Sequence, residues 1–182
     1  DRAEAALRRE ADEKRRKAEE EARSRRSAVL TQLQEFLAKK DLEAALGLAP
    51  ALKDESTARD LLNRDLPAWQ KIEGLLARVS SEATPMGRAS LWGDIQRALP
   101  TGWKLPKRAA RDIESAAMQQ FQDRKFEDGD ANAQLALTID GDCHAARRIH
   151  AMYLLAIAKE PHQAVKVLAP FTLPDTAAEE AW

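Results

Sequence analysis

The residues best suited to bind an anion or an acidic partner lie around Trp103. Lys104, Lys107, Arg108 and Arg111 follow it within eight residues. The last three stand at the start of an expected helix, where their positive charges oppose the helix dipole. Such a mildly unfavourable arrangement can mark a face that binds phosphate or an acidic protein. The alternative interpretation is an ordinary solvated helix surface.

Two further groups of residues could take part in binding. Arg147 and Arg148 would extend the basic segment if the fold brought them close to it. Trp103 and Trp182 stand in a turn and at the end of the sequence, and an exposed tryptophan often anchors an interface. Trp69 and Trp92 lie on apolar stripes and are expected in the core. The candidate partner-binding residues are therefore Trp103, Lys104, Lys107, Arg108, Arg111, Arg147, Arg148 and Trp182.

Catalytic, cofactor-binding and metal-binding patterns are weak. Cys143 and His144 are adjacent and point in different directions on a helix, and His150 is six residues further on, a poor match for one face. No GxGxxG or phosphate-loop pattern is present. Four aspartates are spaced vaguely like calcium ligands, but the central Gly and terminal Glu of a calcium loop are missing. They are Asp128, Asp130, Asp140 and Asp142. We expect no catalytic residue, cofactor or metal, and a role other than that of an enzyme.

The composition favours an all-α protein. Of 182 residues, 44% are hydrophobic and 32% charged, whereas aromatic residues make up only 5%. Sandwiches and barrels need more β-branched, aromatic and turn residues. The net charge of −1 provides no overall field to attract nucleic acid or an anionic membrane.

Three features of the sequence bear on the compartment of the protein and on whether the sequence is part of a longer one. Cys143 is the only cysteine, so an intrachain disulfide is excluded, which fits a reducing, cytoplasmic compartment. No apolar run is long enough to span a bilayer. The sequence begins at Asp1 without Met. We therefore expect it to be part of a larger protein.

We interpret residues 1–28 as a charged helical arm or linker helix. They contain no Gly or Pro, and opposite charges recur at four-residue spacing, as in Glu10 with Lys14. Leu7 is the only large apolar residue, so the seam of a strong coiled coil is missing. A solvated single helix, a weak coiled coil built on alanines and a nucleic-acid-binding arm remain the alternatives.

Residues 29–182 are expected to form the packed helical domain. An apolar stripe begins at Val29, and Asp41 is placed to cap a short helix LEAALGL. We expect an irregular helical part over 29–100, with a loop at 80–87, and helical hairpins over 105–171. The expected helices of that second part are 107–125, 127–139, 142–158 and 161–170.

Two segments of the second part resemble each other. DRKFEDGDANAQLALTIDGD (123–142) and AKEPHQAVKVLAPF (158–171) both suggest a turn followed by a short helix. Aligning Gly129 with Ala164 gives a spacing of 35 residues, close to the period of helix–turn–helix repeats. A third copy is predicted at 38–52, aligned on Ala44.

The aligned residues resemble the tetratricopeptide repeat, a two-helix unit of about 34 residues. Its second helix carries small residues where the helices cross. The first copy matches at Lys125 to Gly129, at Ala136 and at the turn of residues 140–142; the second matches at Glu160 to Ala164 and at Leu168. The resemblance implies stacked hairpins whose surface binds a helix or extended peptide from a partner.

These observations predict an α-solenoid that serves as a protein-interaction or scaffold module. A protein partner is expected, and no membrane-spanning segment. The alternative function is nucleic-acid binding through residues 104–111 and the N-terminal arm, because clustered cations can contact phosphates.

Overall fold

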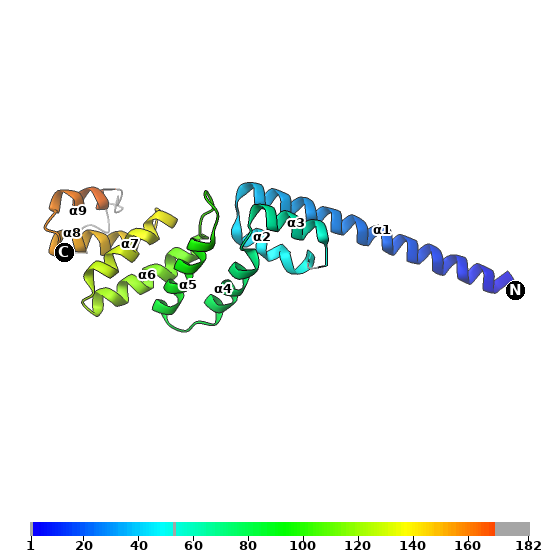
Figure 1. Ribbon diagram of the computed structural model, residues 1–182, viewed down its shortest axis with the longest axis horizontal. Helices are drawn as coiled ribbons and strands as arrows, with labels where there is room; N and C mark the ends of the chain where they lie inside the picture. The colour runs from blue at the N-terminus through cyan, green and yellow to red at the C-terminus, as the bar shows by residue number, and fades with distance from the viewer. Residues whose placement is uncertain (1, 53, 170–182) are drawn as a thin grey trace, which may run out of the picture. The chain divides into compact units, whose positions relative to one another are not determined.

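The computed structural model describes residues 2–52 and 54–169, with side chains from Asp12 onward. The described residues form helices and no strand, which confirms the predicted all-α class (Figure 1). In chain order the helices are α1 (Arg2–Lys39), α2 (Leu42–Leu48), the 3₁₀ helix η1 (Ala49–Leu52), α3 (Ser56–Asp65), α4 (Trp69–Ser81), α5 (Pro85–Ala98), α6 (Lys107–Gln122), α7 (Phe126–Ile139), α8 (His144–Ala156) and α9 (Pro161–Leu168).

The chain divides into two compact units. The first contains Asp1–Gln70 together with Leu99–Trp103, and the second contains Lys71–Ala98 and Lys104–Trp182. The partition suggested by charge and repeat pattern, with an arm over 1–28 and a domain over 29–182, remains a prediction.

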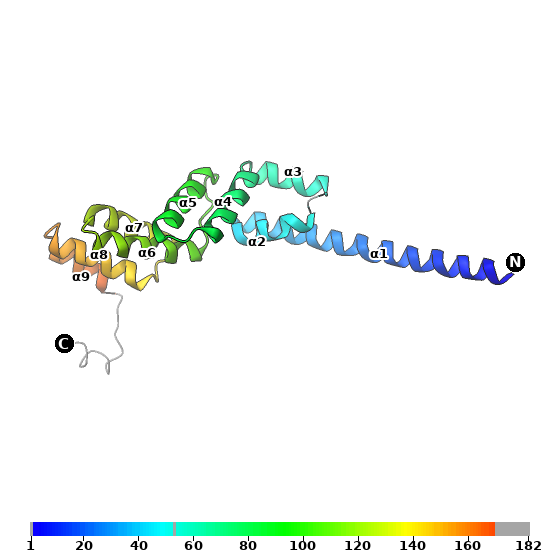
Figure 2. The same ribbon diagram turned by 90° about the horizontal axis from the view of Figure 1, so that it is seen from below.

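In the first unit, α2 and α3 pack beside the C-terminal part of α1 (Figures 1 and 2). Leu33 and Leu37 are buried there, whereas every side chain from Asp12 to Ala28 is exposed. Three ion pairs at four-residue spacing lie along this exposed stretch. Each such pair stabilises a helix by only a few tenths of a kcal/mol. They are Lys17–Glu13 at 3.2 Å, Arg15–Glu19 at 3.7 Å and Arg25–Glu21 at 3.7 Å.

The turn between α1 and α2 depends on a left-handed residue. Lys40 has a φ of 56°, and the amide of Asp41 donates to the carbonyl of Phe36 at 2.9 Å. This bond closes a Schellman motif, which satisfies carbonyls at a helix C-terminus. The Asp41 carboxylate accepts a hydrogen bond of 3.1 Å from the amide of Ala44, confirming the predicted cap of α2.

The same local turn recurs in the second unit. Arg124 and Lys159 both have a φ of 60° and lie 35 residues apart, the spacing found between the two similar segments of the sequence. Each left-handed residue is followed two positions later by the first residue of a helix, Phe126 in α7 and Pro161 in α9. The turn after Arg124 is again a Schellman motif, and it ends α6 at Gln122, three residues before the predicted end.

A small buried residue stands five positions after each left-handed residue. It is Ala45 after Lys40, Gly129 after Arg124 and Ala164 after Lys159. All three are buried, and Ala45 is completely so, whereas Ala44 is only half-buried. In burial, the residue that corresponds to Gly129 and Ala164 is therefore Ala45, one position after the Ala44 used to align the predicted third copy.

The second unit packs each helix from α5 to α9 against the next along the chain. Its core is rich in alanine, which allows helix axes to approach closely. Ile113 and Ile149 supply the larger fully buried side chains around these alanines. The buried alanines of α6, α7, α8 and α9 are Ala109, Ala110, Ala116, Ala117, Ala133, Ala136, Ala146, Ala151 and Ala164.

Buried polar pairs connect the same helices. Gln120 in α6 accepts a hydrogen bond of 2.7 Å from the Asn132 side chain in α7. Asp130 in α7 lies 2.6 Å from Nδ1 of His150 in α8, and its second oxygen accepts from Gln134 at 2.7 Å. Buried polar groups are costly when they lack such partners, so these pairs restrict how the helices can pack.

Substituting Gly129 with Ala should destabilise the second unit. An added Cβ would overlap the Phe121 ring and lie 3.1 Å from the carbonyl oxygen of Ala117. Overpacking of this kind typically costs about 1–3 kcal/mol. We expect a lower urea midpoint by circular dichroism. Gly74→Ala in α4 is the matched control because nothing lies within 4 Å of its added Cβ, and it should gain up to about 1 kcal/mol. Equal effects of the two substitutions would contradict the proposed close contact.

Candidate partner-binding site

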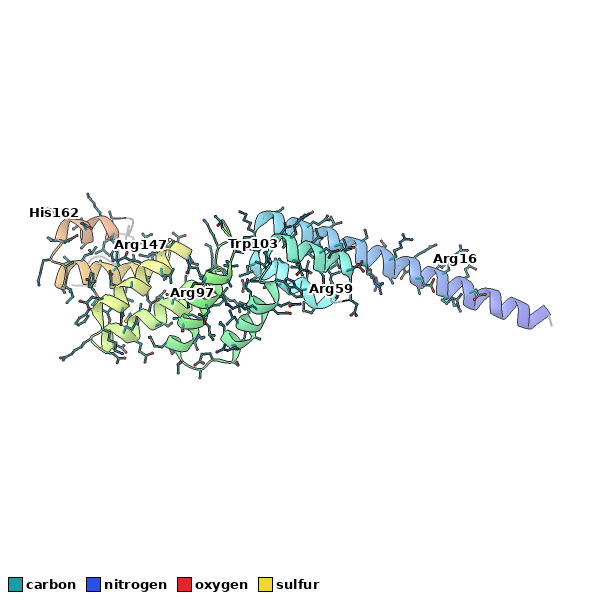
Figure 3. The ribbon with its side chains drawn as sticks, in the orientation of Figure 1. Arg16, Arg59, Arg97, Trp103, Arg147 and His162 are labelled. Carbon is teal, nitrogen blue, oxygen red and sulfur yellow. The ribbon has the colours of Figure 1, made fainter. Side chains whose placement is uncertain are left out.

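Trp103 and the predicted basic segment 104–111 fall in different units. Trp103 belongs to the first unit, where it is half-buried and lines a groove of about 450 Å³ with Lys40 and Arg64 (Figure 3). Lys104 is exposed and belongs to the second unit. Trp103 and the cations that follow it therefore belong to different units.

Lys107 and Arg108 make contacts within the second unit. The Lys107 ammonium lies 3.5 Å from the Asp140 carboxylate at the end of α7. The Arg108 guanidinium lies 5.3 Å from the ring centroid of Trp92, close enough for a cation–π contact. Trp92 is fully buried, as predicted, and its indole donates to Asp112 at 2.8 Å. Arg108 therefore contacts the core through Trp92, whereas Lys107 makes an exposed ion pair that contributes little to stability.

Arg111 and Arg148 are brought together by the fold. Both side chains are exposed and line one groove of about 380 Å³ between the N-terminal halves of α6 and α8. Arg147 is half-buried, and its guanidinium donates to the Gly141 carbonyl (Figure 3). Trp182 lies outside the described residues. The remaining lining residues of the groove are Ala110, Glu114, Asp140, Asp142, Cys143, His144 and Ala145.

Exposed apolar residues follow these arginines along both helices. Helix α7 runs antiparallel to α6 and to α8, so α6 and α8 run in the same direction (Figure 1). Met118 follows Arg111 by seven residues, and Met152 and Leu155 follow Arg148 by four and seven, which places them on the same helix faces. We call Arg111, Glu114 and Met118 of α6, together with Arg148, Met152 and Leu155 of α8, the α6–α8 surface.

This surface has a charged end and an apolar end. The side chains of Met118, Met152 and Leu155 are 43%, 56% and 48% exposed. Flexible methionines are favoured at surfaces that adapt to several apolar ligands. Sequence reasoning missed these three residues because an apolar side chain at helical spacing is ordinarily expected in a core. Whether such a side chain is buried depends on whether another helix packs over that face.

Cys143 helps to hold the charged end in place. Its thiol donates to the Glu114 carboxylate at 2.6 Å and so connects the turn before α8 to α6. Burial, followed by the hydrogen bond to Glu114, raises the pKa of Cys143 from its ordinary value of 9.0 to about 12. The thiol therefore stays protonated at neutral pH and is a poor nucleophile. Because folding raises this pKa, the stabilising contribution of the protonated thiol should fall as pH rises from about 9 toward 12.

Cys143 should react slowly with a thiol reagent. At pH 8 we expect the folded chain to react at least about tenfold more slowly than the urea-denatured chain, because the thiolate is the reacting species and is disfavoured by folding. Glu114→Gln should accelerate the reaction by removing the negative charge beside the thiol. The measurement is the absorbance change with Ellman's reagent. Similar rates for folded and denatured chains would show that the Cys143–Glu114 contact does not protect the thiol.

The residues considered as metal ligands have other roles in this structure. Asp130 is buried and bonded to His150 and Gln134, and Asp140 faces Lys107. Within residues 2–52 and 54–169, no three His, Cys, Asp or Glu side chains are grouped as metal ligands would be. Over the same ranges, no helix has both the length and the apolar character needed to cross a membrane.

A comparison of the chain with protein-family models finds no match, and comparisons with curated proteins and with solved structures find none either.

Proposed function

We propose that this chain is a non-catalytic, cytoplasmic protein-interaction module with tetratricopeptide-like hairpins. The observation that carries the proposal is the α6–α8 surface, which combines exposed cations with exposed apolar side chains. Such a pairing suits an amphipathic helix or extended peptide that has acidic and apolar positions.

The recurring hairpins support the tetratricopeptide-like part of the proposal. Left-handed residues 35 apart and small buried residues at matching positions are what a repeated two-helix unit requires. Stacking such units places the first helices of successive hairpins side by side, as α6 and α8 are here. A partner can then contact both helices at once.

The preferred partner carries carboxylates at one end and apolar side chains at the other. Arg111 and Arg148 would pair with the carboxylates, and the desolvated apolar contacts would supply most of the affinity. Glu114 also lines the charged end, but its carboxylate accepts from the Cys143 thiol. Asp140 and Asp142 line the same groove, so its charge is mixed, and the exposed side chains of Arg111 and Arg148 are the groups that an acidic peptide would contact.

The alternative of nucleic-acid binding has less support. Lys107 makes an exposed ion pair with Asp140, and Arg108 lies over the Trp92 ring, so two of the predicted phosphate-binding cations already have partners within the chain. Along α1, ion pairs join Arg15, Lys17 and Arg25 to glutamates of the same helix. Binding to duplex or single-stranded probes at low salt would favour this alternative, since phosphate contacts are strongest there.

Reversing one charge of the α6–α8 surface should weaken partner binding. The full chain is used to capture proteins from its native host under mild salt, and each captured protein is then titrated against purified variants. We expect Arg111→Glu to raise the Kd of a genuine partner at least about tenfold, because truncating or reversing a well-desolvated contact costs on the order of 2 kcal/mol.

The matched control is Arg97→Glu on α5, an exposed arginine outside the α6–α8 surface (Figure 3). It should leave the Kd unchanged. Met152→Lys supplies a second variant at the apolar end and should weaken binding as well. If neither Arg111→Glu nor Met152→Lys changes the Kd of a partner, that partner binds elsewhere on the chain.

A further inference from the structure

The exposed part of α1 carries charges that alternate in sign along one face. Every side chain from Asp12 to Ala28 is exposed. Residues three and four positions apart share a helix face, so steps of three and four along this stretch follow one side of the helix. Starting from Glu13, these steps meet a negative, a positive, a negative and a positive side chain. They are Glu13, Arg16, Glu20 and Arg23, which we call the α1 stripe.

The α1 stripe is only partly neutralised within its own helix. The Glu13 carboxylate lies 3.2 Å from the ammonium of Lys17. Over the part of the chain that the structure describes, Arg16, Glu20 and Arg23 make no ion pair. Three of the four charges of the stripe are therefore available to a partner outside the chain.

A second copy of α1 in antiparallel orientation has the complementary charges. Arg16 and Glu20 lie two residues to either side of Ala18, and Glu13 and Arg23 lie five residues to either side. A two-fold axis at the height of Ala18 would place Arg16 opposite Glu20 of the second copy. The same axis would place Glu13 opposite Arg23 of the second copy, and each pair would occur twice. A parallel pair in register would instead bring like charges together.

The charges beside the stripe follow the same symmetry. Residues 14–17 are all cationic, and residues 19–21 are all acidic. In the antiparallel arrangement the cationic block of one copy lies next to the acidic block of the other. An exposed ion pair contributes little by itself, so the association depends on several pairs acting together and weakens as salt is added.

The stripe continues on a side of α1 that stays open beside α2 and α3. Ser27 and Thr31 follow Arg23 in steps of four residues, and both are exposed. Leu33 and Leu37 are instead buried where α2 and α3 pack on α1. Within this unit, the N-terminal part of α1 extends past α2 and α3 (Figure 2). A second helix therefore has an open face along which to lie.

We propose that the α1 helices of two copies of this chain pair in antiparallel orientation through the α1 stripe. The stripe lies in the first unit and does not include the α6–α8 surface, so this inference goes beyond the proposed function. The acidic members of the stripe favour a second copy over a nucleic acid, because they would repel phosphates. A dimer would offer two α6–α8 surfaces to a partner that carries two binding segments, which raises the avidity.

Reversing the charges of the stripe tests the pairing. Sedimentation velocity of the full chain at low ionic strength should show a dimer that dissociates when salt is added. Arg16→Glu with Arg23→Glu makes the stripe wholly acidic, and Glu13→Lys with Glu20→Lys makes it wholly basic. Each double variant alone should have a dimer Kd at least about tenfold higher than that of the wild-type chain, because every pair across the stripe becomes repulsive.

An equimolar mixture of the two double variants should associate again, because an acidic stripe then meets a basic one. Exchanging the sign at all four positions, with Glu13→Arg, Arg16→Glu, Glu20→Arg and Arg23→Glu, should keep the wild-type Kd. Circular dichroism checks that each variant retains its helix. A wild-type chain that stays monomeric at low ionic strength, or a mixture that fails to associate, would overturn the proposal.

The matched control is Lys14→Glu with Arg25→Glu. It changes the net charge as much as the acidic double variant does, but on the opposite face of α1. It should leave the dimer Kd unchanged. If the control weakens the dimer as much as the acidic double variant does, net charge and not the stripe governs the association, and the proposal fails.

Spin labels determine the orientation of the pair. Ala22→Cys and Ala28→Cys are labelled one at a time in a Cys143→Ala background, and both sites lie off the stripe. In an antiparallel pair, equivalent labels should be separated along the helix axis by about 12 Å at position 22 and about 30 Å at position 28, because each helix rises about 1.5 Å per residue. Double electron–electron resonance should therefore give the longer distance at position 28. Equal distances at the two positions would indicate a parallel pair and contradict the proposal.

The dimer and the interaction function can fail separately. Arg111→Glu should weaken a captured partner but leave the dimer Kd unchanged, because Arg111 belongs to the second unit. The acidic double variant of the stripe should weaken the dimer but leave the affinity of one α6–α8 surface for a single binding segment unchanged.

Discussion

The close approach of neighbouring helices is the constraint on which the second unit depends. Gly129 has no room for a Cβ beside Phe121 and the backbone of α6, and most of the buried residues around it are alanines. Small side chains bring helix axes together, so that dispersion contacts form along the whole length of α6 and α7. A larger residue at the crossing would separate the helices and disturb the turn that joins them.

An alanine-rich core buries less apolar area per residue than a leucine-rich one, so other interactions must fix the packing. The pairs Gln120–Asn132 and Asp130–His150 are placed at the interfaces of α7 with α6 and α8. Satisfied polar groups of this kind penalise any shift of one helix along another, because a shifted helix would leave them buried without partners. Cys143 and Glu114 add a direct connection between α6 and the start of α8.

This packing also creates the proposed binding surface. Because α7 covers one side of both α6 and α8, the other sides of these two helices are left together and face solvent. Arginines of the first turns and exposed apolar residues of the later turns lie on these two helices. The proposed interaction function uses these exposed faces of α6 and α8. The groove around Trp103 belongs to the other unit and is not part of that proposal.

The sequence by itself determined the features that depend on neighbouring residues. Helical periodicity, the Asp41 cap and the 35-residue spacing of two hairpins were all predicted, because propensity, capping and turn formation act within a few residues. Only the tertiary structure showed that Ala45 rather than Ala44 is buried, since burial depends on the opposing helix. It also brought Arg111 and Arg148 to one groove. Met118 and Met152 are exposed because the described helices leave the faces that carry them uncovered, a property that no local pattern contains.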